Sequence, residues 1–348
     1  MKILIVTDAW RPQVNGVVRT LEATVRELQQ LGHRVQVIAP AEFPTVPCPG
    51  YAEIRLALAS RRALAARIAA ALAGEPLYAL HVSTEGPLGW AARRFCLRHG
   101  LPFTTAYHTR FPQYLNAMFG VPQRWVAYAL GRFHRPAARV LSATPEVDRE
   151  LAALGVTRVA RWTRGVDLQL FRPDLPPSPL VADAPRPRFL YAGRVAVEKN
   201  IEAFLSLDLP GSRIVAGDGP LAPALRRRYP TALFVGRLDS AALARLYASV
   251  DVLVFPSRTD TFGLVQIEAL ACGTPVAAYP VPGPRDVLGG SDVACLQEDL
   301  RAAALQALAI PRARCRAYAE RFSWRAATAQ FVAALAPVEA GRAAAAGG

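Results

Sequence analysis

Lysine is almost missing from this sequence. Of its 41 basic side chains, 39 are arginines and only Lys2 and Lys199 are lysines. Lys2 stands next to the first methionine in an apolar segment, a position that many residue types could fill, so Lys199 is the lysine that needs a chemical reason. An ammonium is a compact charge on a thin stem, whereas a guanidinium is a broad planar fork. A site that keeps lysine in this chain therefore has little room around the charge.

Cysteine is also scarce, and its spacing is uninformative. The five cysteines are an odd number, lie far apart and include no Cys-x-x-Cys pair: Cys48, Cys96, Cys272, Cys295 and Cys315. This pattern argues against a disulfide-stapled scaffold and against a thiolate metal site of the usual spacing. We expect reduced thiols in a cytoplasm.

Long apolar runs are missing as well. The longest stretch without a charge, residues 269–284, is broken by glycine and proline and is shorter than the ~20 apolar residues that span a bilayer. The opening "KILIV" is not preceded by the basic region of an export signal. We therefore expect a cytoplasmic protein without a transmembrane helix.

Carboxylates are outnumbered, 27 against 41 basic residues, for a net charge of +14. Through Asp174 the chain has 22 basic and 12 acidic side chains, net +10, and the remainder has 19 and 15, net +4. Such an excess suits nucleic acid, an anionic membrane or phosphate-bearing small molecules. A nucleic-acid binder would interleave basic and aromatic side chains or show a known module, and neither is evident. We expect no nucleic-acid partner.

Short apolar runs alternate with helical patterns along the chain, the rhythm of βα units. Residues 172–187 interrupt it with six prolines, as a stiff linker would. The pattern predicts an α/β protein with a Rossmann-like domain over 1–171, a second over 188–322, and a closing helix and small-residue tail over 323–348. Two doubly wound domains facing each other would bind ligands at the carboxyl ends of their strands, in the cleft between them.

The segment "AGRVAVEKN" places two cations just past a predicted strand. The strand ends at Gly193, and Arg194 and Lys199 then follow within six residues. A planar fork can clasp two oxygens while an ammonium reaches a third without crowding, which fits a diphosphate. A surface lysine in a turn is the alternative.

A second segment, residues 256–276, predicts a helix that begins after Gly263. Backbone N–H groups near Phe262, Gly263 and Leu264 would be free at the helix N-terminus, where phosphate binds well. Asp260 before the turn and Glu268 inside the helix could accept hydrogen bonds from sugar hydroxyls and a ribose diol. A glutamate on a helix surface is as often merely solvated, but the pair around a phosphate turn is more specific.

These motifs resemble the family 4 retaining glycosyltransferases, which have the GT-B fold. The resemblance rests on "GRVAVEKN", "GDGP" at 217–220, "DTFGLVQIE", the early "TDAWRPQVNGV" and "RGVDLQLFRP" before the linker, and so covers most of the chain. It implies hexosyl transfer from a nucleotide-diphosphate sugar, of the GDP-mannose or UDP-glucose type, to a hydroxyl, as in bacterial α-mannosyltransferases and α-glycosyl-diacylglycerol synthases. The chain departs from the family pattern at Asp260, where the family has a glutamate one methylene longer.

The resemblance also implies roles for other residues. Gly16 would let backbone approach the donor diphosphate, although a plain helix-starting glycine explains it equally well. His108 would lie near the donor sugar, or be a hydrogen-bonded residue at a strand end, and Arg110 would meet the acceptor. Gly217 and Gly219 would contribute backbone to nucleotide binding.

The implied chemistry needs no cofactor. Arg194 and Lys199 would stabilise the departing diphosphate, and no Asp-x-Asp metal signature is present, so we expect no metal. A nicotinamide or flavin enzyme is disfavoured because no G-x-G-x-x-G follows the first strand. A sugar epimerase of the same fold and a non-enzymatic basic binding protein stay as alternatives.

Residues 60–72 predict a helix with an apolar stripe among arginines. The stripe is formed by Leu64, Ile68 and Leu72, with Arg61, Arg62 and Arg67 around it. Such a helix could rest on anionic lipid, which would place the protein on the inner face of the cytoplasmic membrane beside a glycolipid or diacylglycerol acceptor. An ordinary docked helix is the alternative, and we favour it for this segment.

Overall fold

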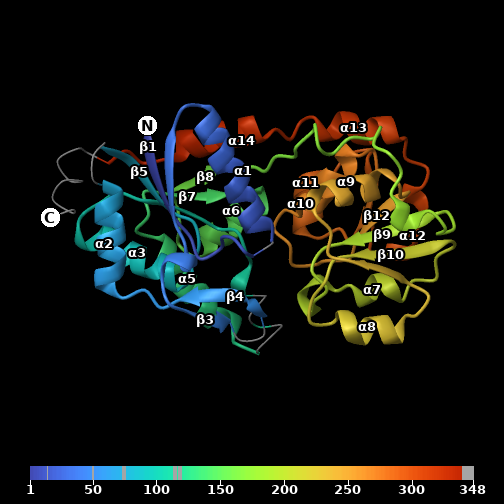
Figure 1. The fold of residues 1–348 in the computed structure, drawn as a ribbon, viewed down its shortest axis with the longest axis horizontal. Helices are drawn as coiled ribbons and strands as arrows, with labels where there is room; N and C mark the ends of the chain where they lie inside the picture. The colour runs from blue at the N-terminus through green and yellow to red at the C-terminus, as the bar shows by residue number, and fades with distance from the viewer. Residues whose placement is uncertain (14, 49–50, 73–75, 113–115, 117–119, 339–348) are drawn as a thin grey trace. The chain divides into compact units, whose positions relative to one another are not determined.

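The chain forms two compact units. A computed structural model describes all residues except 14, 49–50, 73–75, 113–115, 117–119 and 339–348 (Figure 1). Within that part, unit 1 is drawn from Met1–His108, Gln123–Thr163 and the segment that begins at Trp324, and unit 2 from Thr109–Pro122 and Arg164–Ser323. Of the described helices, none is both long and apolar enough to cross a membrane.

Unit 1 is built on a six-stranded sheet in the order β2-β1-β5-β6-β7-β8. All neighbouring strands are parallel. The strands are β1 (Lys2–Val6), β2 (Arg34–Ile38), β5 (Leu77–Val82), β6 (Thr104–Ala106), β7 (Arg139–Ser142) and β8 (Val159–Arg161), and β3 (Thr45–Cys48) and β4 (Tyr51–Ala57) form an antiparallel pair. The helices are α1 (Gly16–Gln30), η1 (Pro40–Glu42), α2 (Arg61–Leu72), α3 (Pro87–Arg98), α5 (Gln123–His134), α6 (Pro145–Ala153) and α14 (Trp324–Ala334).

Helices α1 and α14 lie side by side in unit 1, although they come from opposite ends of the chain (Figure 1). Leu21 and Leu28 of α1 and Phe331 of α14 are fully buried in one cluster with Ile3, Ile5 and the other apolar side chains of that face of the sheet. Burying side chains of this size stabilises a fold by about 1.5–3 kcal/mol each. The closing helix is therefore part of the core of unit 1.

Unit 2 repeats the design with a six-stranded sheet in the order β11-β10-β9-β12-β13-β14, again with parallel neighbours. Its strands are β9 (Arg188–Ala192), β10 (Ser212–Ala216), β11 (Leu233–Gly236), β12 (Val252–Phe255), β13 (Val276–Ala278) and β14 (Ala294–Leu296). Its helices are η2 (Pro179–Val181), η3 (Val197–Lys199), α7 (Glu202–Leu205), α8 (Ala222–Arg228), α9 (Ser240–Ala248), α10 (Leu264–Ala271), α11 (Pro282–Leu288), α12 (Leu300–Ala307) and α13 (Arg312–Ala319).

The predicted α/β class is confirmed for both units, since helices connect parallel strands throughout. In unit 2 the strand order reverses between β9 and β12. Ligands of open parallel sheets bind outside the carboxyl ends of the strands at such a switch point. The predicted linker limits, 172–187, stay a prediction.

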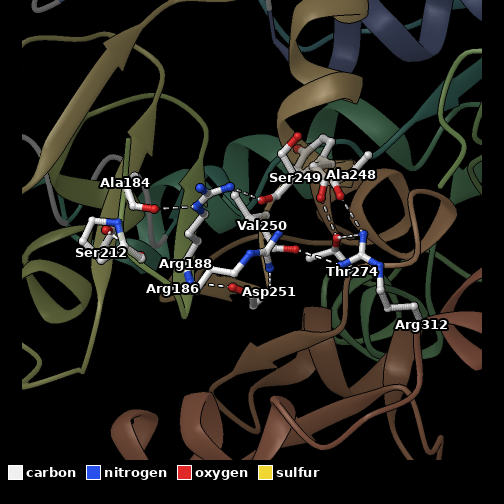
Figure 2. A network of polar contacts seen from close by, with 12 residues as sticks. Ala184, Arg186, Arg188, Ser212, Ala248, Ser249, Val250, Asp251, Thr274 and Arg312 are labelled. Atoms are coloured by element: carbon white, nitrogen blue, oxygen red, sulfur yellow. Dashed lines mark hydrogen bonds and ion pairs between the residues drawn. The ribbon is translucent and has the colours of Figure 1, made fainter. Parts of the chain in front are cut away.

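The opposite, amino edge of this sheet is closed by polar contacts (Figure 2). Asp251 accepts a hydrogen bond from the backbone N–H of Arg188 at 2.7 Å and forms an ion pair with Arg186, which joins the starts of β9 and β12. Arg312 of α13 donates to two backbone carbonyls at the end of α9, each 2.9 Å away. A cation satisfies helix C-terminal carbonyls well. The polar groups named at the amino edge thus bind one another, so we look for ligand-binding groups at the carboxyl edge.

Candidate active site at the switch point of unit 2

Glycines let the chain fold tightly just past β9. A Cβ atom on Gly217 would lie 1.8 Å from the carbonyl oxygen of Gly193, and one on Gly219 would lie 2.5 Å from that of Val195. The "GDGP" turn therefore packs directly on the loop that carries Arg194. This contact explains both glycines by packing alone, and their part in nucleotide binding stays a prediction.

The loop after β9 is tied to the loop after β12 by three side chains. Lys199 forms an ion pair with Asp260. The Asn200 side-chain amide donates to the carbonyl of Pro256 at 3.1 Å, and the Thr259 hydroxyl donates to that of Glu198 at 3.1 Å. The two loops at the switch point are thus held as one surface.

Asn200 was not singled out from the sequence. It is the one described non-glycine residue with a positive φ, +52°. Asparagine tolerates this left-handed conformation far better than most residues. Its position directly after Lys199 could have indicated a left-handed residue at this turn.

Lys199 and Asp260, predicted to serve the diphosphate and the sugar respectively, are in direct contact. Their side chains are 27% and 20% exposed, so the pair is half-buried but open to a ligand. An ammonium has three N–H donors, so contact with Asp260 leaves others for phosphate oxygens. The carboxylate therefore orients the lysine at the carboxyl edge of the sheet, and its contact with a diphosphate stays a prediction.

The start of α10 faces the same edge. Gly263 is its N-cap, with φ +78°, and offers no side chain as an acceptor for the first N–H groups of the helix. Any Cβ at this position would also come within 2.6 Å of the Gln266 amide and 2.8 Å of the Phe255 ring. The amide of Gln266 donates to the carbonyl of Phe262 at 2.7 Å, which fixes the turn. A helix start of this kind suits an anion.

Glu268 lies about one turn into α10 and is only 6% exposed. The hydroxyl of buried Tyr247 on α9 donates to its Oε2 at 3.3 Å. The carboxylate is therefore held in a defined position. Its contact with a ribose diol stays a prediction.

Arg194 is positioned through its backbone. The Tyr191 hydroxyl donates to the Arg194 carbonyl at 2.5 Å. Burial raises the pKa of Tyr191 well above 10, and the nearby charges of Asp260 and Glu198 raise it further. Tyr191 therefore keeps its proton and remains a donor throughout the physiological pH range.

In unit 1, Gly16 is the first residue of α1, as predicted, but the helix is capped by its neighbour. Asn15 accepts hydrogen bonds from the N–H groups of Val17 and Val18, each at 3.0 Å. Two of the N–H groups at the start of α1 are thus already paired within the protein. A diphosphate contact at Gly16 stays a prediction.

His108 follows β6 and is 8% exposed. Its Nε2 lies 3.1 Å from the Ser83 hydroxyl, and its ring meets that of Trp162 at a centroid distance of 5.5 Å. Arg110 is 5% exposed and groups with unit 2, unlike His108. Whether these residues meet the ligand of the switch point stays a prediction.

Glu85 lies just before α3, but its carboxylate contacts another helix. Its Oε1 lies 3.1 Å from Nε2 of buried His134, whose Nδ1 lies 2.9 Å from the Thr105 hydroxyl. Asp8 caps the start of α3: its carboxylate accepts hydrogen bonds from the backbone N–H groups of Leu88 at 2.8 Å and of the next residue at 3.1 Å. Burial raises the pKa of Asp8.

Two of the three residues of the apolar stripe of α2 lie inside unit 1. Leu64 and Ile68 are 1% and 0% exposed, so the docked-helix alternative is confirmed for them. The side chains of Arg61 and Leu72 lie outside the described residues.

Among the residues that are described, no three His, Cys, Asp or Glu side chains gather as metal ligands would.

Family models match both halves of the chain. Residues 14–170 match the model "Glycosyltransferase Family 4", and residues 186–310 match "Glycosyl transferases group 1". A GDP-mannose-dependent alpha-mannosyltransferase of Mycobacterium tuberculosis is 32% identical over 83% of this chain and 81% of its own length. An alpha-monoglucosyldiacylglycerol synthase of Streptococcus pneumoniae is 26% identical over 88% of this chain and 78% of its own.

Solved structures agree on the fold. Sucrose-phosphate synthase from Thermosynechococcus elongatus superposes with a TM-score of 0.74 and 22% identity, over 95% of this chain and 97% of that one. HepE from Anabaena, solved in complex with UDP-glucose, gives 0.68 and 16% identity, over 96% and 100%. The predicted GT-B fold is confirmed.

Proposed function

We propose a specific reaction from one premise: this chain belongs to glycosyltransferase family 4 and is a glycosyltransferase that uses a nucleotide sugar. The donor that we propose is GDP-mannose, and the acceptor is a hydroxyl group of a membrane lipid. The relative at 32% identity is named for GDP-mannose, and the one at 26% is named for a glycosylated diacylglycerol. Neither the nicotinamide nor the nucleic-acid alternative finds support.

One observation carries the proposal: the carboxyl ends of β9 and β12 bring Arg194, Lys199 and the start of α10 to one edge of one sheet. Two cations and a helix N-terminus are complementary to a diphosphate. These groups would hold the diphosphate of the donor, with Glu268 on the ribose and Asp260 beside the sugar.

The same groups would lower the barrier. As the bond between the sugar and the diphosphate breaks, negative charge grows on the leaving group, and Lys199 and Arg194 would stabilise it. A full charge pair at ~4 Å is worth about 4 kcal/mol at an effective dielectric of 20, but only the increase toward the transition state speeds the reaction. An increase of about 2.7 kcal/mol already gives roughly a hundredfold.

The sugar would be transferred with retention. After the diphosphate begins to leave, the acceptor hydroxyl would attack the anomeric carbon from the same face and pass its proton to the departing diphosphate oxygen. We propose that no metal takes part, because the two cations and the helix start supply the positive charge that Mg²⁺ would otherwise provide. We also propose that the enzyme works at the membrane surface, where a lipid acceptor is found.

A panel of nucleotide sugars tests the donor. Purified enzyme is incubated with GDP-mannose, UDP-glucose and ADP-glucose, with and without lipid acceptors, and the release of nucleoside diphosphate is measured. We expect consumption of GDP-mannose above the others. A preference for a uridine sugar would overturn the donor, and no consumption of any nucleotide sugar would overturn the function.

Lysine substitutions test the site in the same assay. Lys199→Arg should cut turnover steeply because the guanidinium is too broad for the space beside Asp260, while the fold stays intact. Lys2→Arg is the matched control, since it makes the same change in unit 1, and it should leave turnover unchanged. Equal turnover of both variants would contradict the role of Lys199.

A further inference from the structure

One stretch of the sequence has an unusual charge pattern. Residues 86–145 contain no aspartate and no glutamate, although they contain eight arginines. Helices α3 and α5 both fall in this stretch, and they lie beside each other (Figure 1). Arg93 of α3 joins them by donating to the carbonyls of Phe133 at 3.0 Å and Arg132 at 2.7 Å.

Helix α5 has one buried face and one exposed face. Leu130 and Phe133 are 4% and 0% exposed, so the helix is firmly docked through them. Trp125 and Tyr128 are 63% and 64% exposed. They are the two most exposed aromatic side chains among the described residues, and tryptophan and tyrosine are enriched at interfaces where one end of the ring is apolar and the other wet.

Two arginines flank these aromatic residues. Arg124 and Arg132 are four residues before and after Tyr128, so both lie within about 40° of it around the helix, and Trp125 lies about 60° away. Both arginines are exposed, and neither forms an ion pair with any described residue. We call Arg124, Trp125, Tyr128 and Arg132 the α5 face.

We propose that the α5 face docks on an anionic lipid bilayer. This inference rests on the proposed lipid acceptor and names the surface that reaches it. Tryptophan and tyrosine favour the headgroup region because each has an apolar ring and a polar tip, and unpaired arginines are attracted to anionic lipid headgroups. The stretch without carboxylates removes the repulsion that an acidic residue would add. Helix α2 does not serve this role through its stripe, since Leu64 and Ile68 are buried.

Vesicle binding tests the α5 face. Flotation is measured with vesicles of phosphatidylcholine alone and of phosphatidylcholine with phosphatidylglycerol. Wild type should bind only the anionic vesicles, and less at high salt. The pair Arg124→Gln and Arg132→Gln should weaken binding about thirtyfold, since each arginine near an anionic leaflet contributes about a fivefold factor. The pair Trp125→Ser and Tyr128→Ser should weaken it comparably.

Matched controls separate a local surface from net charge. Arg226→Gln with Arg227→Gln removes two exposed charges from α8 of unit 2 and should leave flotation unchanged. If these variants weaken binding as much as the α5 variants, or if the α5 variants bind like wild type, the proposal is wrong. It also fails if the α5 substitutions change only the oligomeric state seen by light scattering, because the face would then bind protein.

Vesicle binding and consumption of GDP-mannose can be measured separately, so each proposal can fail without the other. Consumption of GDP-mannose without vesicles should be the same in wild type and in all these variants, because none of the substituted residues is among the groups proposed to hold the donor. An enzyme that consumes GDP-mannose but never floats refutes the α5 face and leaves the donor standing. A protein that floats through α5 but consumes no nucleotide sugar refutes the proposed function alone.

Discussion

Asn200 provides a sharp test because glycine and alanine replacements separate its two roles. Its amide ties the β9 loop to Pro256, and its backbone is left-handed, with φ +52°. Asn200→Gly removes the hydrogen bond but keeps the backbone conformation at no steric cost. Asn200→Ala removes the bond and adds the strain of a Cβ atom in the left-handed region.

The expected magnitudes follow from these two terms. A part-buried hydrogen bond contributes about 1 kcal/mol to stability, and the left-handed conformation costs alanine about 1–2 kcal/mol. The free energy of unfolding should therefore fall by about 1 kcal/mol for the glycine variant and about 2–3 kcal/mol for the alanine variant. Urea denaturation of each protein measures these values.

Asn200→Gly should lower kcat even though the variant stays folded. The Asn200 bond holds the loop that carries Asp260, and a displacement of about 1 Å in a catalytic group can cost a hundredfold in rate. We expect kcat of Asn200→Gly to drop at least about tenfold at saturating donor, in protein that is still fully folded. A glycine variant with wild-type kcat and KM would refute the idea that this bond positions the site.

Three further expectations follow from the structure. His81 is fully buried, and burial lowers its pKa from 6.5 to about 3, so the unfolded chain binds the proton more readily than the folded one. The free energy of unfolding should therefore have its full value above pH 6.5 and be about 2 kcal/mol smaller at about pH 5. In His81→Gln this dependence on pH should be shallower. Glu268→Gln should raise the KM for the donor more than it lowers kcat, if the carboxylate holds the ribose. A chelator such as EDTA should leave initial rates unchanged, and loss of activity that Mg²⁺ restores would contradict the metal-free proposal.

The local features of the fold could be predicted from the sequence. The alternation of apolar runs and helical patterns gave the parallel α/β class, and glycines correctly marked the turn after β9 and the start of α10. These features depend on neighbouring residues, whose conformational preferences are strong.

Long-range packing could not be predicted in the same way. Nothing near Phe331 indicates that α14 joins the core of unit 1 beside α1. Asp8 caps a helix that begins about eighty residues later in the chain, and Glu85 pairs with His134 on another helix. The stripe of Leu64 and Ile68 was visible, but periodicity shows that a face is apolar and does not show what covers it.

Lys199 is the residue on which the proposed diphosphate site depends most. Isothermal titration calorimetry of GDP against wild type and Lys199→Gln measures this directly. A hydrogen bond to a charged group contributes about 1.5–3 kcal/mol, so GDP should bind the variant roughly ten- to a hundredfold more weakly. Equal affinity of the two proteins for GDP would contradict the claim.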